Sequence, residues 1–277
     1  MINTTKMRLL QRLTYFLYGS NFIVAFAGAS LVAGVCALFH LKNGFDYAIL
    51  IFCLLFSVYT LQRFVDHEGF TEEDTDVWGR YSIFSIVFSA IFICVAFVKG
   101  LTLLSFSVEM LFLIGLFTLI SIWYTIPIFG LKLRTIPGLK LLFIASTWIF
   151  ACVYFPLKNE MGVDNFTVIK FCTSLLLYIV ATILPFDIRD KGVDSMVQST
   201  IPQLIGVHLT KLLGICLYLL FGYIAIYSEW ISTNNYLFYG AIIYQVILMG
   251  FVTEKRPFYY FLLVDLGIAF LGWSFFY

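Results

Sequence analysis

Long apolar runs dominate this chain and constrain its fold more than any other feature. They lie near residues 16–39, 46–64, 82–99, 101–123, 138–156, 166–186, 205–227, 237–253 and 257–276. A helix of about 20 apolar residues crosses the hydrocarbon core of a bilayer, where each span must satisfy its own backbone hydrogen bonds. The sequence therefore predicts an all-α, polytopic membrane protein with about nine transmembrane helices. The third and fourth runs are separated only by Lys99 and Gly100.

The composition agrees with a membrane protein and argues against a soluble one. Hydrophobic residues make up 61% of the 277 residues and charged residues only 12%, whereas soluble domains carry roughly a quarter of their residues as charges. The net charge of +1 gives no reason to expect nucleic acid as a partner. No linker or repeat divides the chain, so we expect a single domain over 1–277.

The basic residues predict the orientation, because cytosolic loops of membrane proteins are enriched in Lys and Arg. With the N-terminus in the cytosol, 13 of the 17 basic residues fall on the cytosolic side. The other side receives only Lys42, Lys99, Lys158 and Lys170. We therefore predict a cytosolic N-terminus and an outside C-terminus. Ten of the 16 acidic residues share the cytosolic side, which indicates a face that holds a charged ligand.

A group of aspartates follows the sixth apolar run. If the helix continues there, Asp187, Asp190 and Asp194 lie at i, i+3 and i+7 on one face. Stacked like charges are unfavourable on a bare helix, and Mg²⁺ takes carboxylate oxygens as ligands together with substrate phosphates. The spacing thus favours a metal site at the end of a membrane helix. The alternative is a solvated helix end, whose acids pair with Arg189 and Lys191.

The same segment resembles the second aspartate-rich motif of the UbiA-type membrane prenyltransferases. Asp190 and Asp194 match the two aspartates of its DxxxD pattern, and Asp187 matches an Asn or Asp that precedes them. Thr200 and Gly206 match residues that open the next helix. The segment from Tyr124 to Gly138, which contains Lys132 and Arg134, is similar to the Tyr-Pro-basic segment after helix four of the family.

This resemblance implies a UbiA-like helical bundle that transfers an isoprenyl group from a prenyl diphosphate to a hydrophobic acceptor, aromatic or lipid, within the membrane. It implies Mg²⁺ as cofactor, and its metal ligands would be Asp66, Glu68, Asp187, Asp190 and Asp194. The residues expected to take part in catalysis are Asp66, Asp190 and Asp194. The diphosphate would be bound by Gln62, Arg63, Tyr124, Lys132 and Arg134.

The first aspartate motif of the family, NDxxDxxxD, is changed in this chain. Placing Thr60 on its Asn puts Leu61 and Phe64 where the first two aspartates belong and leaves only Glu68. Read on its own, the helix end offers Gln62 and Asp66 as an i, i+4 pair with Arg63 beside them. Arg63 could neutralise diphosphate where a second metal would otherwise bind.

This change leaves several functional hypotheses. A divergent prenyltransferase with fewer metal ligands is the first, and a non-catalytic prenyl-lipid binding protein on the same scaffold is the second. A small membrane transporter fits less well, because its charges are expected near the bilayer midplane. Two intramembrane acids, Glu109 and Asp265, are functional candidates by their position. Asp265 is the better one, because it lies about eight residues from the cytosolic end of the last helix, near the depth of the expected cavity. The alternative for Asp265 is a hydrogen bond to a neighbouring helix.

Overall fold

The structure, a computed structural model, describes residues 16, 20–65, 72–103, 108–127, 133, 136, 139–160, 163–192, 200–253 and 259–277. The regular structure of this part of the chain is helical throughout. Its helices are α2 (Phe22–Leu38), α3 (Gly44–Val65), α4 (Glu72–Leu103), α5 (Val108–Thr125), α6 (Leu139–Ile149), the π-helix η2 (Phe150–Tyr154), α7 (Phe155–Asn159), α8 (Asn165–Asp190), α9 (Ile201–Tyr227), α10 (Tyr236–Phe251) and α11 (Tyr259–Ser274).

Each predicted apolar run coincides with one of these helices, except that the fifth run forms α6, η2 and α7 in succession. In the described part, five helical segments are long and apolar enough to cross a membrane, and α2, α5, α10 and α11 contain shorter apolar segments. The all-helical fold is thus confirmed, whereas the number of nine crossings stays a prediction.

The predicted boundary between the third and fourth runs was wrong. We placed it at Lys99-Gly100, but α4 continues through both residues to Leu103, and α5 begins at Val108. The charge of Lys99 does not end the helix, because its ammonium lies 2.5 Å from the carboxylate of Asp46 on α3. Pairing removes much of the cost of placing a cation at the end of an apolar helix.

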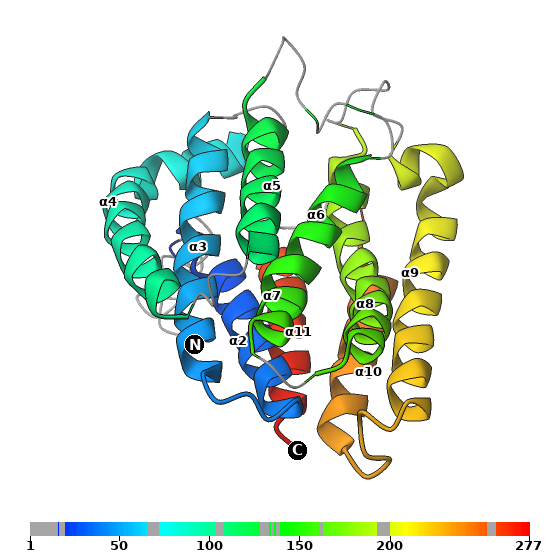
Figure 1. The fold of residues 1–277 in the computed structure, drawn as a ribbon. Helices are drawn as coiled ribbons and strands as arrows, with labels where there is room; N and C mark the ends of the chain where they lie inside the picture. Colours follow the sequence, from blue (N-terminus) through cyan, green and yellow to red (C-terminus); the bar gives the residue numbers. More distant parts are fainter. Residues whose placement is uncertain are drawn as a thin grey trace, which may run out of the picture.

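The long helices run alternately in opposite directions (Figure 1). This brings the last turns of α3, α5 and α8 to one end of the bundle, together with the first turns of α6 and α9. The C-terminus lies at the other end. We call the end that contains the last turns of α3, α5 and α8 the site end.

The helices α2 and α11 pack closely through two glycines, Gly34 and Gly272. A Cβ atom on Gly34 would lie 1.9 Å from the backbone oxygen of Gly272, and one on Gly272 would lie 2.3 Å from that of Ser30. Small residues allow membrane helices to approach backbone to backbone. The helices α2 and α11 are therefore in backbone contact.

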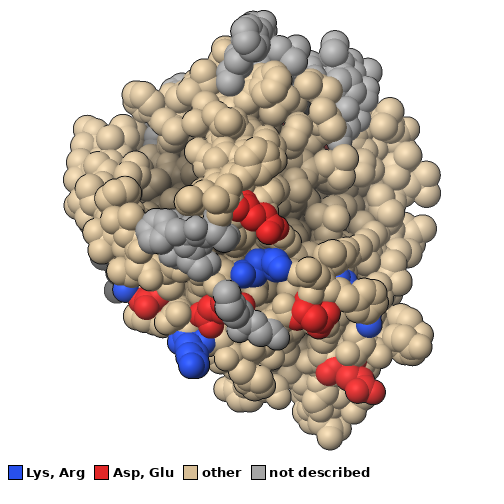
Figure 2. Space-filling view, viewed as in Figure 1, with Lys and Arg blue, Asp and Glu red and all other residues tan. Residues whose placement is uncertain are grey.

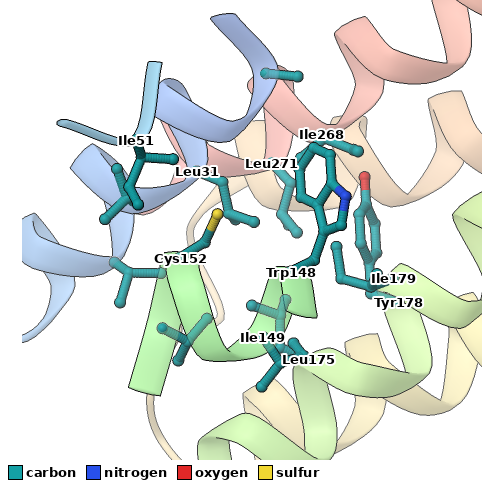
Figure 3. Close-up of a cluster of buried hydrophobic side chains, with 14 of the residues drawn as sticks. Leu31, Ile51, Trp148, Ile149, Cys152, Leu175, Tyr178, Ile179, Ile268 and Leu271 are labelled. Atoms are coloured by element: carbon teal, nitrogen blue, oxygen red, sulfur yellow. The ribbon is translucent and has the colours of Figure 1, made fainter. Parts of the chain in front are cut away.

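The apolar core lies where α6 and η2 meet α2, α8 and α11. Figure 3 shows the Trp148 ring of α6 between Leu271 of α11 and Tyr178 of α8, with the Cys152 sulfur near Leu31. All five of these side chains are buried. The core fixes the height of α6 in the bundle and thereby positions its first turn at the site end.

Charged side chains at the end opposite the site end hold connections between helices. Figure 2 shows acidic and basic side chains close together over the middle and lower part of one face. At this end the carboxylate of Glu160 accepts hydrogen bonds from the backbone N–H groups of Lys42 and Asn43 at 3.0 and 3.1 Å. The side chain of Asn159 donates to the hydroxyl of Tyr47 at 2.7 Å. We interpret these contacts as structural.

Candidate functional site

The end of α8 carries the first pair of predicted site residues. Asp187 is almost fully buried, with 2% of its surface exposed. Its carboxylate lies 3.3 Å from the ammonium of Lys140, in the first turn of α6. A buried carboxylate is stable only when it is paired or hydrogen-bonded. Lys140 therefore compensates the charge that was expected to bind metal.

Asp190 is the last residue of α8 and is paired as well. The guanidinium of Arg189 donates two hydrogen bonds to its carboxylate, from Nε at 2.6 Å and from Nη2 at 3.1 Å. The same guanidinium lies over the ring of Phe186, 5.6 Å from its centroid. This bidentate arrangement fixes both the acid and the arginine.

The helix α8 does not extend over all three predicted aspartates. It ends at Asp190, and a turn follows at Lys191 and Gly192. The amide of Gln203 in α9 donates to the carbonyl of Lys191 at 3.2 Å, which ties the two helices together here. Asp187 and Asp190 thus share a helix, whereas Asp194 lies outside the described residues.

The last turn of α3 places Gln62 and Arg63 at the same end, both partly buried. Their neighbours Leu61 and Phe64, at the positions of the first two family aspartates, are 50% and 59% exposed. Asp66, Glu68, Lys132 and Arg134 were also predicted for this site. All four lie outside the described residues, so their placement stays a prediction.

Electrostatic interactions connect four helices at this end. The positive charges of Arg63 on α3 and Arg189 on α8 act on the carboxylate of Asp265 on α11. Asp265 and Tyr124, near the end of α5, in turn act on the hydroxyl of Tyr59. Asp265 therefore lies within electrostatic reach of Arg63, Arg189 and Tyr59, and Tyr124 lies within reach of Tyr59.

Tyr59 and Lys140 were not expected as site residues. Tyr59 precedes Arg63 by one helical turn, so both lie on the same face of α3, and its hydroxyl accepts a hydrogen bond from Trp148 Nε1 at 3.2 Å. The i, i+4 spacing to a basic residue is the signal that could have found Tyr59. Lys140 was counted only as a cytosolic charge, and its partner Asp187 lies 47 positions away in the sequence.

Of the five predicted metal ligands, only Asp187 and Asp190 are among the described residues, so the Mg²⁺ site stays a prediction. Among the residues that the structure describes, no three His, Cys, Asp or Glu side chains gather at a metal-binding distance. Asp187 is paired with Lys140, and both carboxylate oxygens of Asp190 bind Arg189. The pair of Asp190 with Arg189 matches the alternative for this segment, a helix end whose acids pair with Arg189 and Lys191. Asp187 differs, because its partner is Lys140 on α6.

Comparison with known proteins gives one informative result. A solved structure reported in work on digeranylgeranylglyceryl phosphate synthase in membranes is similar over 96% of this chain and 98% of its own, with a TM-score of 0.54 and 13% sequence identity. No family model matches the sequence, and the search of curated proteins found no match. At this identity the likeness concerns the fold, which agrees with the predicted UbiA-like bundle. Together with its long apolar helices, it identifies an integral membrane protein.

Proposed function

We propose that this protein is a UbiA-like membrane prenyltransferase that uses a prenyl diphosphate. The observation that carries the proposal is the gathering of Arg63, Lys140 and Arg189 at one end of a bundle whose fold is similar to that of a prenyl-transferring synthase. Basic groups are needed there to bind the diphosphate, because a phosphate anion is stable in a membrane protein only where cations compensate it.

The chemistry follows from this placement of charge. The bond between the first isoprenyl carbon and the diphosphate oxygen breaks, and the diphosphate leaves with the electron pair. A nucleophilic atom of the acceptor forms a new bond to that carbon and gives up its proton. Basic side chains stabilise the negative charge that develops on the leaving diphosphate. Tyr59, Tyr124 and Trp148 are aromatic groups near the charged cluster, and aromatic faces stabilise an allylic cation.

Release of diphosphate tests the proposal. The purified protein in lipid vesicles is given geranylgeranyl diphosphate and a hydrophobic acceptor fraction, and pyrophosphate is measured over time. We expect release above that of protein-free vesicles, with Arg189→Gln reducing it at least tenfold. Asp46→Asn, which changes an ion pair at the opposite end, serves as the control and should leave the rate unchanged.

A second candidate function is prenyl-lipid binding without turnover. The ion pairs Asp187–Lys140 and Asp190–Arg189 favour it, because acids that already hold cations are poor metal ligands. Binding of geranylgeranyl diphosphate without pyrophosphate release would support this function. Extraction of lipids from the purified protein identifies the ligand class in either case, since a prenylated species should be recovered with it.

Mg²⁺ remains part of the proposal, and Asp190 is the described residue on which to test it. Binding of the ion would require Asp190 to exchange Arg189 for the metal. If it does, Mg²⁺ should strengthen the binding of geranylgeranyl diphosphate to the wild type, and Asp190→Asn should abolish this gain. Equal affinities for both proteins, with and without Mg²⁺, would contradict a metal site here.

A further inference from the structure

A groove lies between the first half of α8 and the last turn of α9, at the end of the bundle opposite the site end. The two helices lie side by side (Figure 1), and the groove has a volume of about 330 Å³. Its walls are the apolar side chains of Phe166, Ile169 and Leu177 on α8 and of Ile224 on α9. Phe166 and Ile169 are exposed, so in a membrane protein the groove opens toward lipid.

Two small residues, Thr173 and Ser174, line the groove between these walls. The hydroxyl of Thr173 donates to the carbonyl of Ile169 at 2.8 Å, and that of Ser174 donates to the carbonyl of Phe171 at 2.9 Å. Both hydroxyls are thus satisfied by their own helix. The short side chains leave room between the larger ones, and the surface that they present to the groove is apolar.

The length of the groove matches one lipid acyl chain. Its lining residues on α8 run from Phe166 to Leu177, which is about 16 Å along the helix at a rise of about 1.5 Å per residue. The hydrocarbon core of a bilayer is about 30 Å thick, so this length corresponds to about one leaflet. A lipid tail that lies along α8 would therefore fill the groove.

The charged residue that lines the groove, Lys170, lies near the start of α8. Its ammonium lies over the ring of Trp230, 5.4 Å from the centroid, and this ring packs edge to face against the buried ring of Phe171 at 5.0 Å. Trp230 follows the end of α9. The cation–π contact thus holds the ammonium at the end of the bundle, where the headgroups of a bilayer lie.

The charge of Lys170 determines which lipid fits the groove. Among the described residues no carboxylate pairs with Lys170, although charged side chains in membrane helices are normally compensated. Basic side chains next to the headgroups attract anionic lipids. The groove therefore combines an apolar surface for a chain with a cation at the height of the phosphate.

We propose that this groove binds an anionic phospholipid, with one acyl chain between α8 and α9 and its phosphate at Lys170. Charge complementarity at Lys170 and the length of the apolar lining carry the inference. It does not depend on the proposed function, because the groove and the site end lie at opposite ends of the bundle.

A comparison of two lipids with the same chains tests the proposal. The full-length protein is stripped of lipid in detergent and titrated with dioleoyl-phosphatidylglycerol or dioleoyl-phosphatidylcholine, and bound lipid is measured by native mass spectrometry. We expect the wild type to bind the anionic lipid about fivefold more tightly than the zwitterionic one. Lys170→Gln should abolish this preference. Lys42→Gln, which removes an exposed cation at the same end but outside the groove, is the control and should keep it.

Filling the groove tests the position of the acyl chain. Thr173→Phe and Ile224→Trp each place a large ring in the groove, from α8 and from α9. Each should weaken the binding of both lipids about fivefold, because the chain loses its contacts with the helices. The two substitutions lie on different helices, so if one of them prevents folding, the other still provides the test.

Three outcomes would overturn the proposal. Equal affinity of the wild type for the two lipids, or a preference that survives in Lys170→Gln, would exclude a phosphate site at this lysine. An equal loss of the preference in Lys42→Gln would show a diffuse attraction to surface charge. Unchanged binding by the groove-filling variants that fold would place the lipid elsewhere on the protein.

Discussion

At the scale of single residues, the buried ion pair of Lys140 with Asp187 is expected to contribute strongly to the stability of the site end. The carboxylate of Asp187 and the ammonium of Lys140 are both mostly buried, with 3% and 15% of the side chains exposed. Removing one partner of a buried pair leaves an uncompensated charge, which costs about 3–5 kcal/mol. We therefore expect Lys140→Met to lower the unfolding temperature in detergent markedly.

The double variant Lys140→Met with Asp187→Leu provides the control for this prediction. It replaces both charges by apolar groups, and such a replacement is often neutral for stability. Its unfolding temperature should therefore lie well above that of Lys140→Met alone. Equal unfolding temperatures of the two variants would show that an unpaired Asp187 does not destabilise the protein.

Gly206 is the second residue whose effect can be predicted. It interrupts the helical geometry of α9 with φ 81° and ψ 163°, a conformation that is essentially restricted to glycine. A Cβ atom here would meet nothing within 4 Å, so the cost of Gly206→Ala is one of backbone strain. We expect a loss of about 1–3 kcal/mol in the free energy of unfolding. Gly250→Ala, where a Cβ also has open space, is the control and should not destabilise the protein.

At the scale of the elements, the contact between α2 and α11 should be the most sensitive to side-chain size. A methyl group on Gly34 would overlap the backbone of Gly272, and backbone cannot give way as a flexible side chain can. Gly34→Ala should therefore destabilise the protein by about 1–3 kcal/mol. In Gly115→Ala the new methyl group meets nothing within 4 Å, so this variant should be neutral or slightly stabilised. Thermal unfolding of both variants in one detergent provides the comparison.

The consequence for the site lies in α11, which carries Asp265. If α2 pushes α11 aside in Gly34→Ala, the affinity for geranylgeranyl diphosphate should change as well, although Gly34 is far from the charged end in sequence and in height. An affinity equal to that of the wild type would mean that α11 keeps its place through the hydrogen bonds from Tyr178, Tyr244 and Gln245.

For the whole molecule, the helices could be predicted from the sequence because long apolar runs with few charges are typical of membrane helices. The end of α8 could not be predicted, because the spacing of its aspartates permits a longer helix than the one that forms. The pairing of Asp187 with Lys140 was not predictable either, since it depends on how α6 packs against α8.

The orientation in the membrane is a prediction for the whole chain. Thirteen of the 17 basic residues fall on one side when the N-terminus is cytosolic, and this bias determines topology in most membrane proteins. The last described turns of α3, α5 and α8 lie at one end of the bundle and the C-terminus at the other, so a single measurement orients the site. A reporter that is active only in the cytosol should be inactive when fused after Tyr277 and active when fused before Met1. The reverse pattern would place the charged cluster on the outer side and contradict the predicted orientation.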